Sequence, residues 1–236
     1  MEVSLYPFVV SRYARAMGQC RETFGTLLAA VSLGASRTRC INRRLTATVL
    51  CLCVIAAHAN PWDDAAAAYG RGDHTAALQR FRSLAEAGDA AAQYNMGIMC
   101  DNGEGTIEDH AEALTWYRLA AEQGHMNAQF SLAHMYRSGE GTSRDHTQAL
   151  KWYRLAAEQG HIGALNDLGV AYDKGLGVSP DYVEAHKWYD LGANRAIDEN
   201  RRSRSIKNRG LVAAKMSSEQ IDEARRLARE WDKAHR

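Results

Sequence analysis

The ten residues Trp-Tyr-Arg-Leu-Ala-Ala-Glu-Gln-Gly-His occur twice in this chain, at positions 116–125 and again, unchanged, at 152–161. The copies are 36 residues apart, and a further step of 36 reaches Trp188-Tyr189. When the units are aligned, other equivalent positions, here called columns, also hold the same residue type every 36 residues. They are Ala92, Ala128 and Ala164; Gly103, Gly139 and Gly175; Gly105, Gly141 and Gly177; and Asp109, Asp145 and Asp181. So many columns in one register indicate a repeat protein, in which neighbouring units cover one another.

Each unit has the pattern of a helix, a glycine loop and a second helix. In the middle unit, apolar residues recur at i, i+4, i+7 and i+8 from Ala128 to Tyr136, which is helical spacing. A Gly-x-Gly loop follows, and its glycines can adopt the positive φ that ends a helix. The second helix gathers Ala149, Trp152, Tyr153, Ala156 and Ala157 on one face. The sequence therefore predicts an all-α fold, an α/α solenoid of helix–loop–helix repeats with a period of about 36 residues.

The two ends of the repeat region differ from its interior, as terminal capping units do. Asp73 to Gly88 match the second helix of a unit, but no Gly-x-Gly loop accompanies them. Near the other end, Ser217 and Gln220 predict a capping box, and an amphipathic stripe from Ile221 to Trp231 predicts a closing helix over 218–231. The predicted divisions are a leader at 1–59, a shortened unit at 60–90, repeats at 91–127, 128–163 and 164–199, and a basic segment with the closing helix at 200–236.

The third repeat carries the most complete pattern, and this pattern resembles a known family. Its residues are Ala164, Leu168, Gly169, Tyr172, Gly175, Gly177, Val178, Asp181, Ala185, Trp188 and Tyr189. They resemble the Sel-one-like repeats, relatives of the tetratricopeptide repeat, and the resemblance spans about residues 62–199. It implies a solenoid that serves as an interaction module in signalling and assembly. The chain departs from the pattern at Cys100, which replaces a tyrosine, and at Ala196, which replaces the final glycine.

The leader has the three-part form of a secretory signal peptide. Arg43 and Arg44 precede an apolar stretch from Leu45 to Ala57, and Ala57-His58-Ala59 provides an A-x-A cleavage site. This stretch of thirteen residues reaches only ~20 Å as a helix, short of the ~30 Å core of a bilayer. A membrane anchor or a buried N-terminal helix is the alternative. We expect translation to begin near Ile41, cleavage after Ala59 and a periplasmic or secreted product without a stable membrane span.

The charge distribution and the cysteine content bear on partners. Residues 61–194 carry ten Lys and Arg against nineteen Asp and Glu, whereas residues 195–236 carry twelve against seven. The formal net charge of +1 argues against a nucleic-acid partner for the chain as a whole. The basic stretch 201–209 is either a second candidate surface or a soluble linker to the closing helix, and the linker is the favoured reading. After cleavage only Cys100 remains, so no internal disulfide can form.

No motif predicts a catalytic, cofactor or metal site. The Gly-Glu-Gly-Thr loops lack the Gly-Lys-Ser/Thr of a phosphate loop. Histidines in one column lie on successive units and do not converge on a metal, so we expect solvated loop histidines at His74, His110, His146, His125 and His161. Cys100 is expected to be a buried packing residue. The column of Trp116, Trp152 and Trp188 is expected to be core, and Trp152→Ala to cost about 3–5 kcal/mol.

Function is then expected to lie on the surface. In tetratricopeptide-like units the first helices line a concave groove, and a peptide or a partner's helix binds there. The expected groove residues are Tyr94, Ile98, Asp101 and Asn102; Phe130, His134, Arg137 and Ser138; and Asn166, Val170, Asp173 and Lys174. The main hypothesis is a non-catalytic protein-binding scaffold or adaptor of the cell envelope.

Two alternatives come from other functional classes. One is a β-lactamase-like or penicillin-binding activity, as in a cysteine-rich branch of the family, although neither paired cysteines nor an S-x-x-K motif with its partners is present. The other is a secreted effector that meets host proteins.

Overall fold

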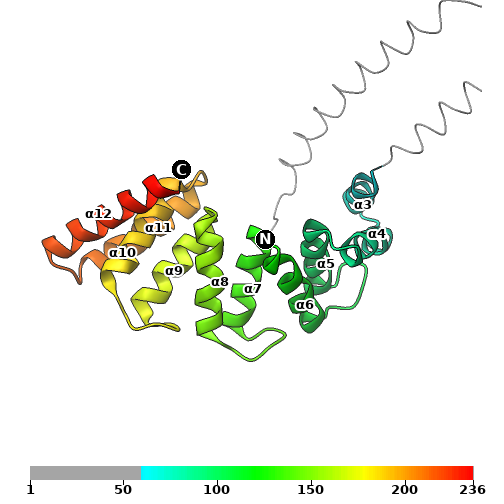
Figure 1. Ribbon diagram of the computed structural model, residues 1–236, viewed down its shortest axis with the longest axis horizontal. Helices are drawn as coiled ribbons and strands as arrows, with labels where there is room; N and C mark the ends of the chain where they lie inside the picture. Colours follow the sequence, from blue (N-terminus) through cyan, green and yellow to red (C-terminus); the bar gives the residue numbers. More distant parts are fainter. Residues whose placement is uncertain (1–59, 236) are drawn as a thin grey trace, which may run out of the picture. The chain divides into compact units, whose positions relative to one another are not determined.

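A computed structural model describes residues 60–235, and every regular element in that range is a helix. The helices are α3 (Pro61–Gly70), α4 (His74–Glu86), α5 (Ala90–Asn102), α6 (His110–Glu122), α7 (Met126–Ser138), α8 (His146–Glu158), α9 (Ile162–Lys174), α10 (Tyr182–Arg195), α11 (Glu199–Ala213) and α12 (Ser218–Ala234). From α3 to α10 each helix packs on the next, in a row of helix pairs (Figure 1). The predicted all-α repeat solenoid is confirmed.

The aspartate column marks the start of every second helix. The side chains of Asp109, Asp145 and Asp181 each accept hydrogen bonds from the backbone N–H groups two and three residues later. These N–H groups have no partner within the helix, so such a cap stabilises the helix by about 1 kcal/mol. The recurrence of aspartate at this position in each unit is therefore explained by helix capping.

The two glycines of each loop have different tasks. The first, for example Gly139, is the C-cap of the first helix and adopts the left-handed conformation, with φ 86°. The second approaches the previous unit: a Cβ on Gly141 would lie 2.2 Å from the carbonyl oxygen of His110. Gly105 and Gly177 make the same approach to His74 and His146. The second glycine thus lets two units touch backbone to backbone.

The adjacent tryptophan and tyrosine in the second helix of each repeat differ in burial, since one lies in the core and the other mostly at its edge. Tyr117, Tyr153 and Tyr189 are all buried. In the tryptophan column Trp188 is buried, whereas Trp116 and Trp152 are only partly buried and pack against the core. Trp152 contacts both halves of the core. The tyrosine column, more than the tryptophan column, therefore forms the centre of each unit.

The ends of the row are closed by helices that match the predicted caps. In the first pair, Trp62 of α3 packs edge-on against Phe81 of α4, with ring centroids 5.4 Å apart. At the other end, α12 begins with the predicted capping box of Ser217 and Gln220. Its Trp231 packs against Trp188 of α10, with ring centroids 5.6 Å apart.

The basic stretch 201–209 is helical, so the linker reading was wrong. It lies within α11, which Asp198 caps by accepting a hydrogen bond from the backbone N–H of Arg201. Ser205 and Val212, seven residues apart on one helical face, are buried, and α11 packs on α10. Only a narrow face of α11 is buried. The sequence of this segment therefore shows no clear apolar periodicity.

Some sequence predictions concern residues outside 60–235. The signal peptide, its cleavage site and four of the five cysteines lie there. Within the described range, Cys100 is fully buried, as predicted, and burial raises the pKa of its thiol to about 11. None of the helices in that range has the length and apolar character needed to cross a membrane.

Candidate functional site

The predicted groove residues lie on α5, α7 and α9, the first helices of the three repeats. We call the solvent-facing sides of these helices the first-helix surface. The candidates fall into four columns along it, each with one residue per repeat. The columns differ in how strongly their side chains are already engaged within the chain.

The innermost column joins each unit to the next. Tyr94 packs against His125, with ring centroids 4.7 Å apart. Phe130 packs in the same way against His161, at 4.2 Å. Asn166 is buried and accepts a hydrogen bond of 3.2 Å from the Asn208 amide of α11. These residues were expected as open anchors, but they lie in contacts between units.

The histidines in these contacts are structural, which corrects the expectation of solvated loop residues. His125 and His161 are the N-caps of α7 and α9, where Nδ1 accepts the backbone N–H three residues later. Asp89 does the same for α5 in the preceding unit. Burial lowers the pKa of His125. Burial, aided by the nearby Arg201, lowers the pKa of His161 to about 4. Capping requires a neutral imidazole, because a protonated Nδ1 cannot accept the hydrogen bond from the backbone N–H.

These pKa values predict a loss of stability in mild acid. The unfolded chain binds a proton at His161 near pH 6.5 and the folded chain only near pH 4, so the free energy of unfolding falls between these values and levels off below them. His161→Asn keeps a capping side chain and removes the titration. We expect urea unfolding of this variant at pH 7 and pH 4 to show about 2–3 kcal/mol less acid-induced loss than the original chain. An unchanged loss would contradict the assignment.

The column of Asp101, Arg137 and Asp173 is also engaged. Asp101 lies 2.8 Å from Nδ1 of His110, which raises the pKa of His110. Arg137 donates a hydrogen bond of 3.1 Å to the Tyr153 hydroxyl. Asp173 accepts one of 2.7 Å from Lys215. The charges on this column therefore hold the second helices and the C-terminal segment in place.

A residue that the sequence did not point to, Asp167, lies beside this column. It lines a small hollow among α7, α8 and α9 together with Arg137 and Tyr153. Burial raises the pKa of the Asp167 carboxyl, and Arg137 and Arg204 oppose the shift. A signal was present, because the same column holds Asn95 and Ser131, polar residues within otherwise apolar helix faces.

The two remaining columns make local contacts: Ile98 and Val170 pack against the core, His134 lies 3.9 Å from Glu140, and Asn102 donates to Glu104. Ile98, His134 and Val170 are half-buried and form a ridge along the three helices. Asn102, Ser138 and Lys174, one turn further on, are exposed. We call these six residues the open ridge. The column of Asn102, Ser138 and Lys174 is the most solvent-exposed part of the predicted groove.

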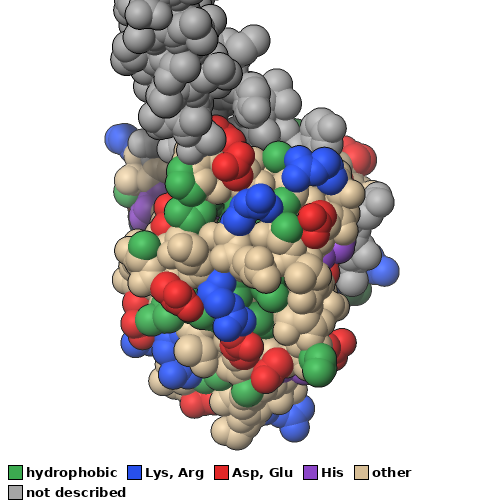
Figure 2. Space-filling model, turned by 90° about the vertical axis from the view of Figure 1, so that its right-hand side faces the viewer, with side chains coloured by type: hydrophobic (Ala, Val, Ile, Leu, Met, Phe, Trp, Pro, Cys, Tyr) green, Lys and Arg blue, Asp and Glu red, His purple; other side chains and the backbone are tan. Residues whose placement is uncertain are grey.

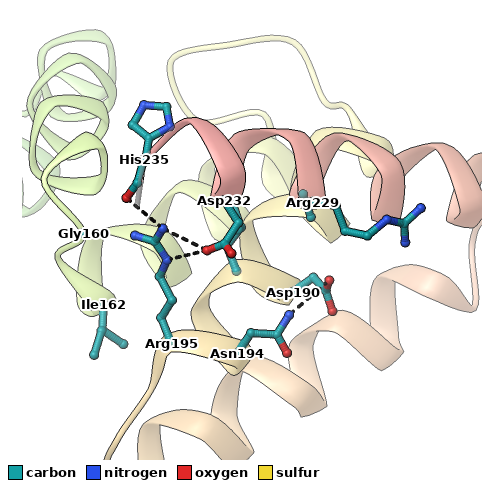
Figure 3. Close-up of a pocket in the computed structure, with 10 residues that line it drawn as sticks. Gly160, Ile162, Asp190, Asn194, Arg195, Arg229, Asp232 and His235 are labelled. Carbon is teal, nitrogen blue, oxygen red and sulfur yellow. Dashed lines mark hydrogen bonds and ion pairs between the residues drawn. The ribbon is translucent and has the colours of Figure 1, made fainter.

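A hollow of about 790 Å³ lies elsewhere, between the turn before α9 and helices α10 and α12. Its polar groups bind one another: Arg195 contacts Asp232 at 2.9 Å and the His235 carbonyl at 3.2 Å, and Asn194 donates to Asp190 (Figure 3). These contacts fix α12 as the closing helix. Among residues 60–235 no group of three His, Cys, Asp or Glu side chains could hold a metal ion.

Comparisons with known proteins agree with this architecture. The model of the Sel1 repeat matches residues 90–125, 127–161 and 162–196. A solved Sel1 repeat protein from Oxalobacter formigenes is 31% identical, with a TM-score of 0.54, over 63% of this chain and 74% of that one.

The chain belongs to the Sel1 repeat family. It is also similar to a protective antigen of uropathogenic Escherichia coli strains with an SLR fold, at 28% identity and a TM-score of 0.50. That match covers 68% of this chain and spans 41% of the length of the antigen. The comparison with curated proteins gave no match. Sel1 repeats generally form non-catalytic scaffolds for protein–protein interaction, and the fold of this chain supports such a scaffold.

Proposed function

We propose that this Sel1 repeat protein is a non-catalytic scaffold or adaptor of the cell envelope that binds a peptide or protein segment along the open ridge. The observation that carries the proposal is the division of the predicted groove. Its inner and charged columns contact other helices or the C-terminal segment, whereas Asn102, Ser138 and Lys174 are exposed beside the half-buried Ile98, His134 and Val170. Apolar and polar side chains alternate along this ridge, which suits the side chains of a bound segment.

Continuity along the row favours an extended partner over a small ligand. The contacts of Tyr94 with His125 and of Phe130 with His161 hold successive first helices side by side. A segment lying across them would contact equivalent positions of three units in turn. Affinity would then come from several modest contacts, as is usual for repeat proteins.

The test compares variants of the open ridge with a matched control. Asn102→Arg with Ser138→Arg adds two positive charges at exposed ridge positions. Thr115→Arg with Glu122→Gln adds the same charge at exposed positions of α6. We expect partners cross-linked to the original chain in an envelope fraction to be recovered at least about tenfold less with the ridge variant, because central interface changes dominate binding. Equal recovery with both variants would reject the ridge.

The envelope location rests on the leader in the sequence, with its arginine pair and A-x-A site. We expect the mature protein to begin near Asn60, and N-terminal sequencing of the purified product measures this directly. A mature protein that retains residues 43–59 would exclude cleavage at this site and with it the proposed route to the envelope.

A further inference from the structure

Helix α11 continues the first-helix surface beyond the last repeat. Two hydrogen bonds occur in the same order along α9 and α11: Asn208 donates to Asn166, and Lys215 donates to Asp173 near the end of both helices. In the same order, Arg201 near the start of α11 helps to lower the pKa of His161 at the start of α9. The two helices therefore run parallel, as successive first helices do. A segment bound along the open ridge can extend onto α11.

The exposed side of α11 is basic. Residues 200–215 contain six Lys and Arg and no Asp or Glu. Three of these six are engaged: Arg202 with Glu199, Arg209 with Asp190, and Lys215 with Asp173. The other three, Arg201, Arg204 and Lys207, are exposed and form no salt bridge within residues 60–235.

These three side chains lie on one side of the helix together with an exposed leucine. Arg201, Arg204, Lys207 and Leu211 follow at steps of three or four residues, which places them along one face. Leu211 is 59% exposed. We call these four residues the basic stripe. From Arg201 to Leu211 it is ~15 Å long, at ~1.5 Å per residue.

The rest of the described surface limits what can bind there. Residues 61–194 carry nine more acidic than basic side chains. At the far end of the row from α11 (Figure 1), the face seen in Figure 2, acidic and basic side chains are interspersed rather than gathered into one basic field. A long polyanion or an anionic membrane would meet repulsion from the neighbouring repeats, whereas a short acidic segment needs only the stripe.

We propose that the basic stripe binds a short acidic segment of a partner protein, with an apolar side chain of that segment placed against Leu211. This inference rests on the proposed scaffold function and names the chemistry of one part of the partner. Carboxylates of the segment would pair with Arg201, Arg204 and Lys207. The charge pairs would speed association and set the direction in which the segment lies on the surface.

The test measures fluorescence anisotropy of the purified chain with three labelled peptides of equal length, built from Leu with Glu, Gln or Lys. We expect the Glu peptide alone to bind, with an affinity that decreases as salt is added. The triple variant Arg201→Glu, Arg204→Glu and Lys207→Glu should weaken binding at least about tenfold. The control, Arg225→Glu, Arg229→Glu and Lys233→Glu, makes the same charge change at exposed positions of α12 and should bind as the original chain does.

Several results would overturn the proposal. These are equal loss in both triple variants, equal binding of the Gln peptide, or tighter binding of phosphatidylglycerol vesicles or single-stranded DNA than of the Glu peptide. Circular dichroism would establish that both variants are folded. If envelope partners depend on Asn102 and Ser138 but not on the stripe, this inference fails while the proposed scaffold function stands.

Discussion

Gly141→Ala is expected to lower the free energy of unfolding by about 3–5 kcal/mol, a loss at the upper end for a single substitution. Gly141 has φ 66°, a conformation that alanine adopts only at a cost. The new Cβ would also lie 2.2 Å from the His110 carbonyl oxygen and 2.5 Å from its carbon. Both are backbone atoms at the start of α6, so the two units must move apart to relieve the clash.

Gly124→Ala is the control that separates these two causes. Gly124 has a similar φ of 85°, but nothing lies within 4 Å of the position of its Cβ. We expect this variant to lose only about 1–2 kcal/mol, the cost of the left-handed conformation itself. Urea unfolding of both variants measures the difference. Equal losses would mean that the backbone contact between units adds nothing to stability.

Tyr153→Ala is expected to cost about 3–5 kcal/mol, more than Trp152→Ala. Tyr153 is 2% exposed, and its ring centroid lies 5.7 Å from that of Phe130. Its hydroxyl accepts a hydrogen bond from Arg137. The substitution opens a cavity at the centre of a unit. It also removes the hydroxyl to which Arg137 donates.

The neighbouring Trp152 is only partly buried, so the cost expected for Trp152→Ala falls from about 3–5 kcal/mol, as predicted from the sequence, to about 2–3 kcal/mol. Tyr153→Phe keeps the ring and should cost about 1 kcal/mol, the value of one hydrogen bond. Denaturant unfolding of the three variants gives the order directly. A larger loss for Trp152→Ala than for Tyr153→Ala would show that the tryptophan column is the true centre of the unit.

Much of the fold was readable from the sequence because its causes are local. The capping aspartates, the helix-ending glycines and the apolar spacing each act within about one turn of helix. Repetition at 36 residues made these weak signals add up. The capping box of Ser217 and Gln220 is also local, which is why the closing helix was predictable.

The candidate site was less predictable because side chains at one spacing face different neighbours. Tyr94 and His134 are both half-buried residues of first helices, yet Tyr94 packs on His125 at the start of α7, whereas His134 lies beside Glu140 in the loop after its own helix. The capping role of His161 involves the start of α9 and the Phe130 ring of α7, two helices separated along the chain by α8. The spacing of residues within one helix does not carry that information.

The sequence was sufficient to predict a Sel1 repeat solenoid with capped ends, since each local signal recurs along the chain. Which columns form contacts between helices, and which are exposed, became clear from the packing of the helices. This packing also turned the basic stretch from an expected linker into α11, because burial of Ser205 and Val212 against α10 fixes a helix whose other faces are polar. A contact between two units depends on the side chains that both units contribute. The repeat pattern describes the residues of one unit and does not say which of them meet those of its neighbour.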